Sequence, residues 1–498
     1  MRGRGARRAA IFIALTSLLG AGDALADPTP TTASPPTATA TATATAPEPE
    51  PFLIDYDAPD PKRNGLSVGR AFANMFFEEY LLWQIDWFRG PDWNPVTRSS
   101  IGAIAGSNFQ FDYDPFGEDM FGHPLHGTMH FNSARAAGLS FWESALFPFI
   151  GALAWETVGE RQLTYDGGWR SKPSTNDFLM TATTGPLLGE GLYRLSSIML
   201  DDRTTGGERF LRELAAAVFS PMRGFNRLYT GEAWHLGPGP LRSHPLFLSL
   251  DLGVDQVHRH DLGGTTTNGP TALVATEIHY GDMLPSAGKS TLDPLEVFDA
   301  YIALRLFGND HLNGSQAYVH GLLFGWSADL SSKDAPHRSN NVFGIMQSFD
   351  FHGASDIRFA GLSIGPADYI EWRFAKNRFF RVGVDLDWTY LAASDSPFSI
   401  EGRGHEFVMG GALEENARLD LRDLGRFTAR SRHFLTTAVD GQGGDEFFWY
   451  GRLSYDVDLT RGIAIGVAPT VARRRSRQDT RSAVEESIDV QAFLRLHN

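Results

Sequence analysis

The spacing of apolar side chains changes once along the chain, from a helical repeat to an alternating one. From about residue 66 to residue 217, apolar positions recur every three or four residues, which is the spacing of one helix face. From about residue 243 the repeat becomes two residues, as expected of strands with one apolar face. The pattern therefore predicts a helical domain at residues 61–240 and a β-domain at residues 241–498.

The alternating segments have one purely apolar face, while the other face carries charge and glycine. In "FRVGVDLDWTY", for example, Val382, Val384 and Leu386 alternate with Gly383 and Asp385. Such segments are about ten residues long and roughly ten to twelve occur, which is typical of an outer-membrane barrel with its apolar side chains toward lipid. A soluble β-sandwich shows the same alternation with its apolar face inside.

The start of the chain favours the barrel. Residues 1–26 have the parts of a secretory signal peptide, namely an arginine-rich start, an apolar run and the small-residue cleavage signal Ala24-Leu25-Ala26. Repeats of Ala, Thr and Pro follow, so residues 27–60 are expected to be a disordered linker. These features predict export through the general secretory route to the outer membrane of a Gram-negative bacterium.

The expected fold class is α+β, with an N-terminal polar-faced helical bundle and a C-terminal antiparallel outer-membrane-type β-barrel of roughly 10–12 strands. The absence of cysteine excludes disulfides and thiolate metal ligands. The last residue, Asn498, departs from the aromatic residue usual at the end of such barrels.

The charge of the chain bears on its partners. The net charge is −15, and an acidic exported protein lacks the basic surface that nucleic acids require. After the signal peptide, no apolar run is long enough for a transmembrane helix. The expected partner is outer-membrane lipid, without nucleic acid, and the sequence identifies no protein partner.

Ionisable side chains recur inside the otherwise apolar helical segments. His123, His126 and His130 are spaced so that all three can share one helix face. His126 and His130 have the four-residue spacing of a zinc-binding pair, although the glutamate of the zinc-protease motif is missing. Glu156 and Glu160 repeat that spacing.

Two interpretations of these residues stay open. In the first, His126, His130, Glu156 and Glu190 are catalytic candidates, acting as general bases or through a metal. In the second, they belong to a packed polar network that fixes the helices. The network is expected to comprise His123, Asn132, Arg135, Glu143, Glu160, Asn176, Asp177, Tyr193 and Arg194. The sequence commits to no cofactor, and a divalent metal at His126 and His130 remains open.

A run of short motifs spans residues 114–197. They are His123-Pro124 with Gly127, Phe131-Asn132 with Ala134-Arg135, Phe141-Trp142-Glu143-Ser144, Trp155-Glu156 with Glu160, Pro173-Ser174 with Asn176-Asp177, and Leu188-Gly189-Glu190 with Tyr193-Arg194. This block resembles an uncharacterised bacterial family, domain of unknown function 3943, with Pro186 standing where a second glycine is expected. The resemblance implies an exported, outer-membrane protein and supplies no reaction.

The charged face of the strands needs partners, and the helices carry unusual internal polar groups. We therefore expect the helices to plug or underlie the barrel. The expected function is that of an outer-membrane β-barrel protein with a helical plug or periplasmic domain, in a structural or transport-related envelope role. The alternative is a barrel-associated hydrolase of lipid or envelope material that uses the His/Glu residues, with or without a metal.

Overall fold

The computed structural model describes most of the chain beyond residue 52. The described residues are 53–60, 64–89, 104, 106–112, 114–159, 162–163, 169–170, 172–241, 245–260, 266–282, 290–308, 314–331, 337–354, 357–375, 378–395, 397–398, 404–421, 424–441 and 443–498. The expected signal peptide, most of the expected linker and Glu160 lie outside them.

The first part of the described chain is helical, as the spacing of apolar positions predicts. Its helices and helical turns are α2 (Gly65–Arg89), η1 (Glu118–Gly122), α4 (His123–Arg135), α5 (Phe141–Ser144), α6 (Leu146–Ala154), η2 (Trp155–Gly159), α7 (Thr175–Met199), α8 (Gly206–Phe219) and α9 (Pro221–Thr230). Pro124 lies in the first turn of α4, and Ser140 forms a capping box with Glu143 at the start of α5. Among the described residues, no helix is long and apolar enough to cross a bilayer.

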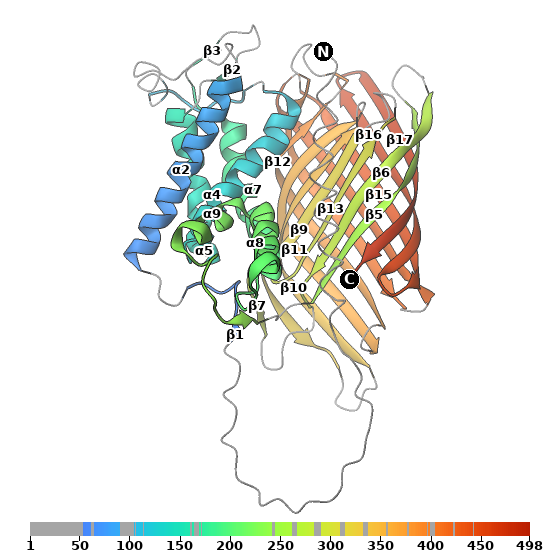
Figure 1. Ribbon diagram of the computed structural model, residues 1–498. Helices are drawn as coiled ribbons and strands as arrows, with labels where there is room; N and C mark the ends of the chain where they lie inside the picture. The colour runs from blue at the N-terminus through green and yellow to red at the C-terminus, as the bar shows by residue number, and fades with distance from the viewer. Residues whose placement is uncertain are drawn as a thin grey trace, which may run out of the picture.

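The second part is a closed antiparallel barrel (Figure 1). Its described residues form twelve long strands. The strands are β5 (Leu246–His260), β6 (Thr266–Tyr280), β8 (Phe298–Leu306), β9 (Gly314–Asp329), β10 (Arg338–Ala354), β11 (Arg358–Ala375), β12 (Arg378–Ser394), β13 (Glu406–Asp420), β14 (Arg426–Asp440), β15 (Asp445–Thr460), β16 (Ile463–Gln478) and β17 (Arg481–His497). Pairing of β17 with β5 and of β9 with β10 closes the ring. The short strand β7 (Thr291–Leu292) pairs with β9.

The strands turn their apolar side chains to the outside of the barrel and their polar side chains to the lumen. On β5, Leu252 and Val254 are exposed on the outer wall, whereas Asp251 and Asp255 are buried in the lumen. This is the inside-out polarity of an outer-membrane-type barrel and not that of a sandwich. The expected fold class is therefore confirmed.

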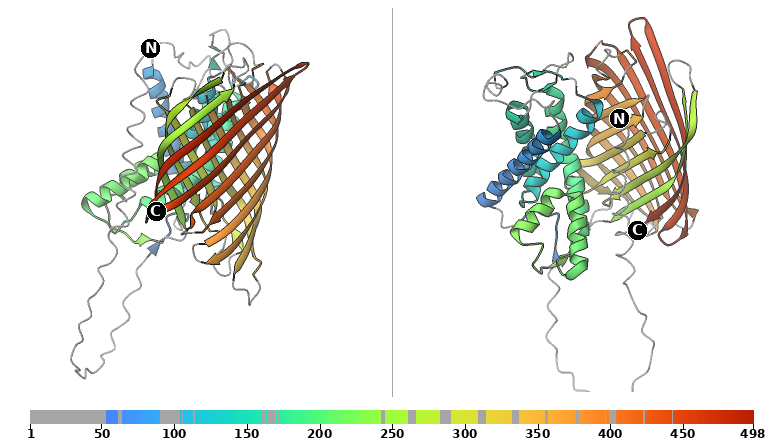
Figure 2. Two further views of the ribbon diagram at one scale, coloured as in Figure 1. Left: turned by 90° about the vertical axis from the view of Figure 1, so that its right-hand side faces the viewer. Right: turned by 45° about the horizontal axis from the view of Figure 1, so that its top comes forward.

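The helical domain packs against the outer wall of the barrel, beside strands β9 to β12 (Figures 1 and 2). From these strands, the Gln347 amide donates to the Thr183 carbonyl of α7 at 2.7 Å, and the Tyr390 hydroxyl donates to the Thr183 hydroxyl at 3.0 Å. On β10, Phe349 joins the apolar core shared with α4 and α7, while its neighbour Asp350 points into the lumen. Of the two expected placements, in the lumen or beneath the barrel, the described helices therefore contradict the plug in the lumen.

The charged lumen finds its partners within the barrel itself, which explains why the helices stay outside. Arg305 of β8 donates to Asp489 of β17 at 2.6 Å, and His320 Nδ1 of β9 lies 2.9 Å from Glu414 of β13. Each pair joins strands that are several positions apart around the ring. Side chains from strands three and four positions apart therefore meet within the lumen in the described strands.

Part of the expected linker is ordered and ties the chain start to both domains. Strand β1 (Leu53–Ile54) pairs in parallel with β4 (Gly239–Pro240), and Tyr56 is buried. The Asp57 carbonyl accepts from Arg135, and its carboxylate accepts from the Tyr280 hydroxyl at 2.9 Å. The folded chain therefore begins before residue 61, because Tyr56 is buried and Asp57 contacts both a helix and the barrel. A further short pair, β2 (Gln162–Leu163) and β3 (Trp169–Arg170), follows η2.

Candidate functional site

Two glutamates of α2 and two histidines of α4 meet inside the helical domain. We refer to Glu78, Glu79, His126 and His130 as the Glu/His cluster. The Nε2 atom of His126 lies 3.5 Å from Glu78 Oε1 and 3.4 Å from Glu79 Oε2. For His130, Nε2 lies 3.2 Å from Glu79 Oε1, and Nδ1 lies 2.8 Å from Glu78 Oε2. Four ionisable groups thus converge on one small volume.

The packing of three helices builds this cluster. Helix α2 crosses α4, where the Asn74 amide donates to the Ser133 carbonyl at 3.2 Å. On the other side, Gly151 of α6 faces the His130 ring so closely that an added Cβ would lie 2.4 Å from the ring carbon Cδ2. The Trp155 ring packs edge-on against His126, with 5.0 Å between ring centroids. Glycine at this position is therefore what admits the imidazole between α4 and α6.

Burial sets the charge states of the cluster. It raises the pKa of Glu78 well above the usual value, an effect that His126 opposes and Glu79 strengthens. Burial lowers the pKa of His130, which Glu79 opposes. Without a bound cation, the site therefore favours a protonated Glu78 carboxyl and a neutral imidazole at His130.

Several atoms of the cluster lack ordinary hydrogen bonds. Within the described chain, Glu78 Oε1, both Glu79 carboxylate oxygens, His126 Nε2 and His130 Nε2 are buried and have no hydrogen-bond partner of good geometry. Such groups normally carry an energetic penalty unless a ligand satisfies them. The arrangement of Glu78, His126 and His130 is compact enough to hold one metal ion.

A second polar cluster joins the helical domain to the barrel. His123 Nε2 lies 3.2 Å from Asp177 Oδ1, and His405, next to β13, places Nε2 2.9 Å from Asp119 Oδ2. The Asn176 amide donates to Asp119 at 3.2 Å and also to Asp112 and Asp177. Burial, reinforced by the neighbouring carboxylates, raises the pKa values of Asp119 and Asp177. Burial also lowers the pKa of His123 to about 4.

Glu190 lies in a network of arginines, apart from the histidines. Its carboxylate accepts from Arg135 Nε at 2.7 Å, and Arg194 Nε lies 3.1 Å away. The Arg135 guanidinium also stacks over the Tyr193 ring, 4.7 Å from its centroid. All these side chains are buried, so the network joins α4 to α7 by charge-assisted hydrogen bonds.

The remaining candidates of the sequence lie at helix starts or in the packed interior. Glu156 accepts from the Ser174 backbone amide at 2.7 Å at the start of α7. Glu143 caps α5, and the buried Asn132 amide has no hydrogen-bond partner among the described residues. The structure thus brings His126 and His130 together, and separates both from Glu190.

Sequence reasoning missed the acidic half of the cluster. Glu78 and Glu79 are adjacent carboxylates inside the apolar stretch "FFEEYLL". Two charges in the middle of an apolar helix were the available signal, because charged residues are rarely buried without a partner. His405 and Asp119 carried no comparable signal.

The comparisons with known proteins agree with this division of the chain. Residues 108–222 match the family model described as Domain of unknown function (DUF3943), which confirms the resemblance. The matched stretch contains His126 and His130 but neither Glu78 nor Glu79. No curated protein matches the sequence.

Several solved structures of outer-membrane channels resemble the chain at low similarity. The NanC porin is 12% identical, with 49% of this chain and 98% of that chain covered and a TM-score of 0.23. The outer membrane channel DcaP of Acinetobacter baumannii is 8% identical, with 52% and 98% covered and a TM-score of 0.23. The P. putida toluene transporter TodX is 9% identical, with 52% and 90% covered and a TM-score of 0.23. At these scores, no property of the channels transfers to this chain.

Proposed function

We propose that this protein resides in the outer membrane and that its helical domain binds a divalent transition-metal ion at the Glu/His cluster. The barrel supplies the scaffold, and the metal fixes the packing of α2 against α4. The observation that carries the proposal is the set of distances between the histidine nitrogens and the glutamate oxygens.

Those distances agree with the edges of a coordination shell. Ligand atoms placed tetrahedrally at zinc-ligand distances lie about 3.3 Å from one another. Here, His126 Nε2 lies 3.5 Å from a Glu78 oxygen and 3.4 Å from a Glu79 oxygen, and His130 Nε2 lies 3.2 Å from Glu79. An ion between these atoms would satisfy the groups that lack hydrogen bonds.

The donor set indicates the class of ion. Imidazole nitrogen with carboxylate oxygen suits zinc, iron and related divalent ions, whereas calcium and magnesium prefer oxygen alone. His130 also has the second contact that is common for metal-binding histidines, since its Nδ1 lies beside the Glu78 carboxylate. Glu79 is the most accessible of the four side chains and marks the side from which an ion could enter.

The alternative without metal is a packed ion-pair network. In that case, a protonated Glu78 and a neutral His130 share one hydrogen bond, which explains their 2.8 Å contact. The other cluster atoms are left without hydrogen bonds. No contact among the described residues favours the barrel-associated hydrolase. The side-chain pairs within the lumen support a structural role more than an open channel.

The test is metal analysis of the full chain purified in detergent from the membrane fraction. We expect about one divalent ion per chain, lost on replacement of His126 and His130 by alanine and retained in His235→Ala. His235 is a suitable control because its side chain is exposed and, among the described contacts, its ring hydrogen-bonds the nearby Gly231 carbonyl. A metal-free wild-type protein whose unfolding is unaffected by added zinc or by chelator would overturn the metal proposal.

A further inference from the structure

The outer face of the helical domain is more apolar than that of a water-soluble bundle, although the domain also has an apolar core that includes Phe147. Helix α6 contains no charged residue, and its exposed positions carry large apolar side chains, with Leu146 60% and Phe149 51% exposed. Its buried positions include the small residues Gly151 and Ala152. In water, such a helix would turn its large side chains inward.

Helix α2 repeats this arrangement. Phe76 and Tyr80 are each 58% exposed, while Asn74 and Glu78 on the same helix are buried. A surface helix of a soluble protein normally shows the reverse, with the charged residues outside and the aromatic residues inside. Two helices thus present apolar surface outward while they hold the Glu/His cluster inside.

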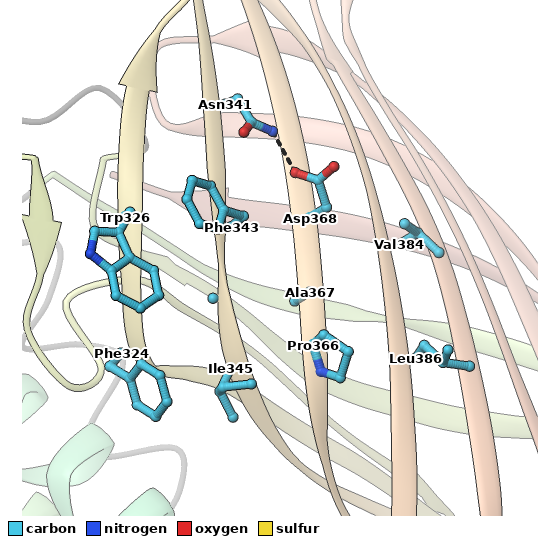
Figure 3. Close-up of a pocket in the computed structure, with 11 residues that line it drawn as sticks. Phe324, Trp326, Asn341, Phe343, Ile345, Pro366, Ala367, Asp368, Val384 and Leu386 are labelled. Atoms are coloured by element: carbon cyan, nitrogen blue, oxygen red, sulfur yellow. Dashed lines mark hydrogen bonds between the residues drawn. The ribbon is translucent and has the colours of Figure 1, made fainter.

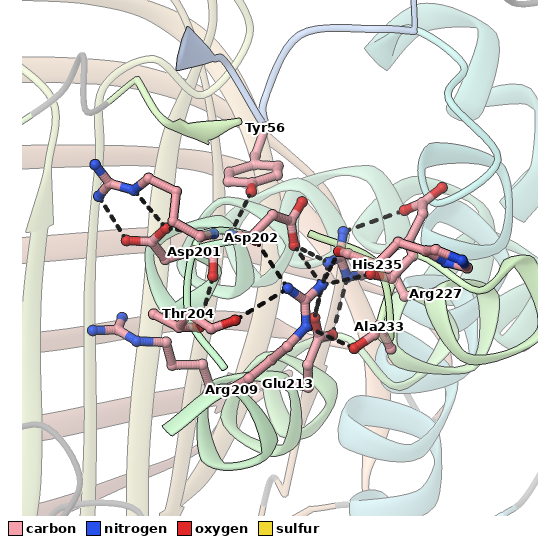
Figure 4. A network of polar contacts seen from close by, with 12 residues as sticks. Tyr56, Asp201, Asp202, Thr204, Arg209, Glu213, Arg227, Ala233 and His235 are labelled. Atoms are coloured by element: carbon pink, nitrogen blue, oxygen red, sulfur yellow. Dashed lines mark hydrogen bonds and ion pairs between the residues drawn. The ribbon is translucent and has the colours of Figure 1, made fainter. Parts of the chain in front are cut away.

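Helices α8 and α9 show the same inversion around a buried ion network. Arg209 donates to Asp202 at 3.1 Å and Arg227 donates to Glu213 at 2.8 Å in the interior (Figure 4). On the outside, α8 exposes Phe210 at 63%. A cavity of about 470 Å³ opens beside it, lined largely by apolar side chains of both helices.

The barrel wall next to the helices is a lipid-type surface. A groove of about 660 Å³ on its outer face is lined by side chains such as Phe324, Phe343 and Leu386 (Figure 3). These residues belong to β9, β10 and β12, of which β10 and β12 also contact the helical domain through Gln347 and Tyr390. The exposed apolar faces of the helices therefore continue the apolar belt of the barrel.

We infer that the helical domain lies within the membrane beside the barrel, with the exposed apolar side chains of α2, α6 and α8 in contact with lipid hydrocarbon. Contiguous apolar surface of this kind marks an interaction site. Its continuity with the barrel wall identifies bilayer lipid as the occupant. The inference rests on the proposed membrane location of the barrel and is independent of the metal.

The complete absence of cysteine makes a clean test available. Single cysteines at Leu146 and Phe210 are labelled with a polarity-sensitive fluorophore, and the full chain is reconstituted in phosphatidylethanolamine/phosphatidylglycerol vesicles. Leu386→Cys on the barrel wall is the lipid-facing reference. Glu208→Cys, at the exposed start of α8, is the water-facing reference. Fluorescence loss is measured with acyl-chain nitroxide lipids and with aqueous iodide.

We expect the nitroxide lipids to quench the labels at positions 146 and 210 as strongly as the label at position 386. We expect iodide to quench these labels only weakly. If the label at position 386 meets lipid while both helix labels meet only iodide, the inference is overturned and the barrel location stands. If all the labels meet only iodide, the proposed membrane location fails as well.

Discussion

Replacing Glu190 by glutamine should destabilise the helical domain strongly. The Glu190 carboxylate is buried and pairs with two guanidiniums, with Arg135 Nε at 2.7 Å and Arg194 Nε at 3.1 Å. After the change, Asp57, 3.7 Å from Arg194, is the nearest carboxylate that remains among the described contacts. Removing one partner of a buried ion pair costs about 3–5 kcal/mol. Because glutamine keeps one acceptor oxygen, we expect about 3 kcal/mol, or roughly a hundredfold in the unfolding equilibrium.

The free energy of unfolding can be followed by urea titration in detergent, using far-ultraviolet circular dichroism of the helices. Glu208→Gln is the matched control, since Glu208 is exposed and its 2.9 Å pair with Arg212 connects neighbouring turns of α8. Such surface pairs contribute about 0.3–0.5 kcal/mol. A loss at Glu190→Gln no larger than that of this control would refute the assignment of Glu190 to a buried charge network.

Three further predictions concern the metal and the lumen. Gly151→Ala should displace the His130 ring and so weaken zinc binding about tenfold or more, as measured by calorimetry. An unchanged zinc affinity would contradict the close approach of Gly151 to the ring. Zinc uptake should release protons and strengthen as pH rises, because the pKa of Glu78 is raised and the metal needs its ionised form. Titration in buffers of different ionisation enthalpy would detect this release, and buffer-independent heats would count against it. In planar bilayers, the wild-type protein should show no steady ion conductance. Arg432→Ala removes a 2.7 Å contact with Asp387 in the lumen and should introduce conductance. A conducting wild-type protein would disprove the interpretation that side chains block the lumen.

Periodicity determined the two classes of element and which side chains share a strand face, whereas the outward direction of the apolar face came from the structure. Side chains alternate along any strand, so Leu252 and Asp251 had to lie on opposite faces whatever the surrounding structure. Segment length and number then favoured a barrel of about the observed size. The i, i+4 spacing of His126 and His130 likewise placed both on one side of α4 before any tertiary contact was known.

Tertiary structure alone decided what those faces meet. Glu78 lies 52 positions before His130, and only the crossing of α2 over α4 brings their side chains to 2.8 Å. Periodicity along one helix specifies its faces and says nothing about the neighbouring helix, so the acidic half of the Glu/His cluster escaped the sequence. The position of the helices outside the barrel was also decided by tertiary contacts. Lumen charges such as Arg305 and Asp489 pair with each other, so the helices pack on the apolar outer wall instead.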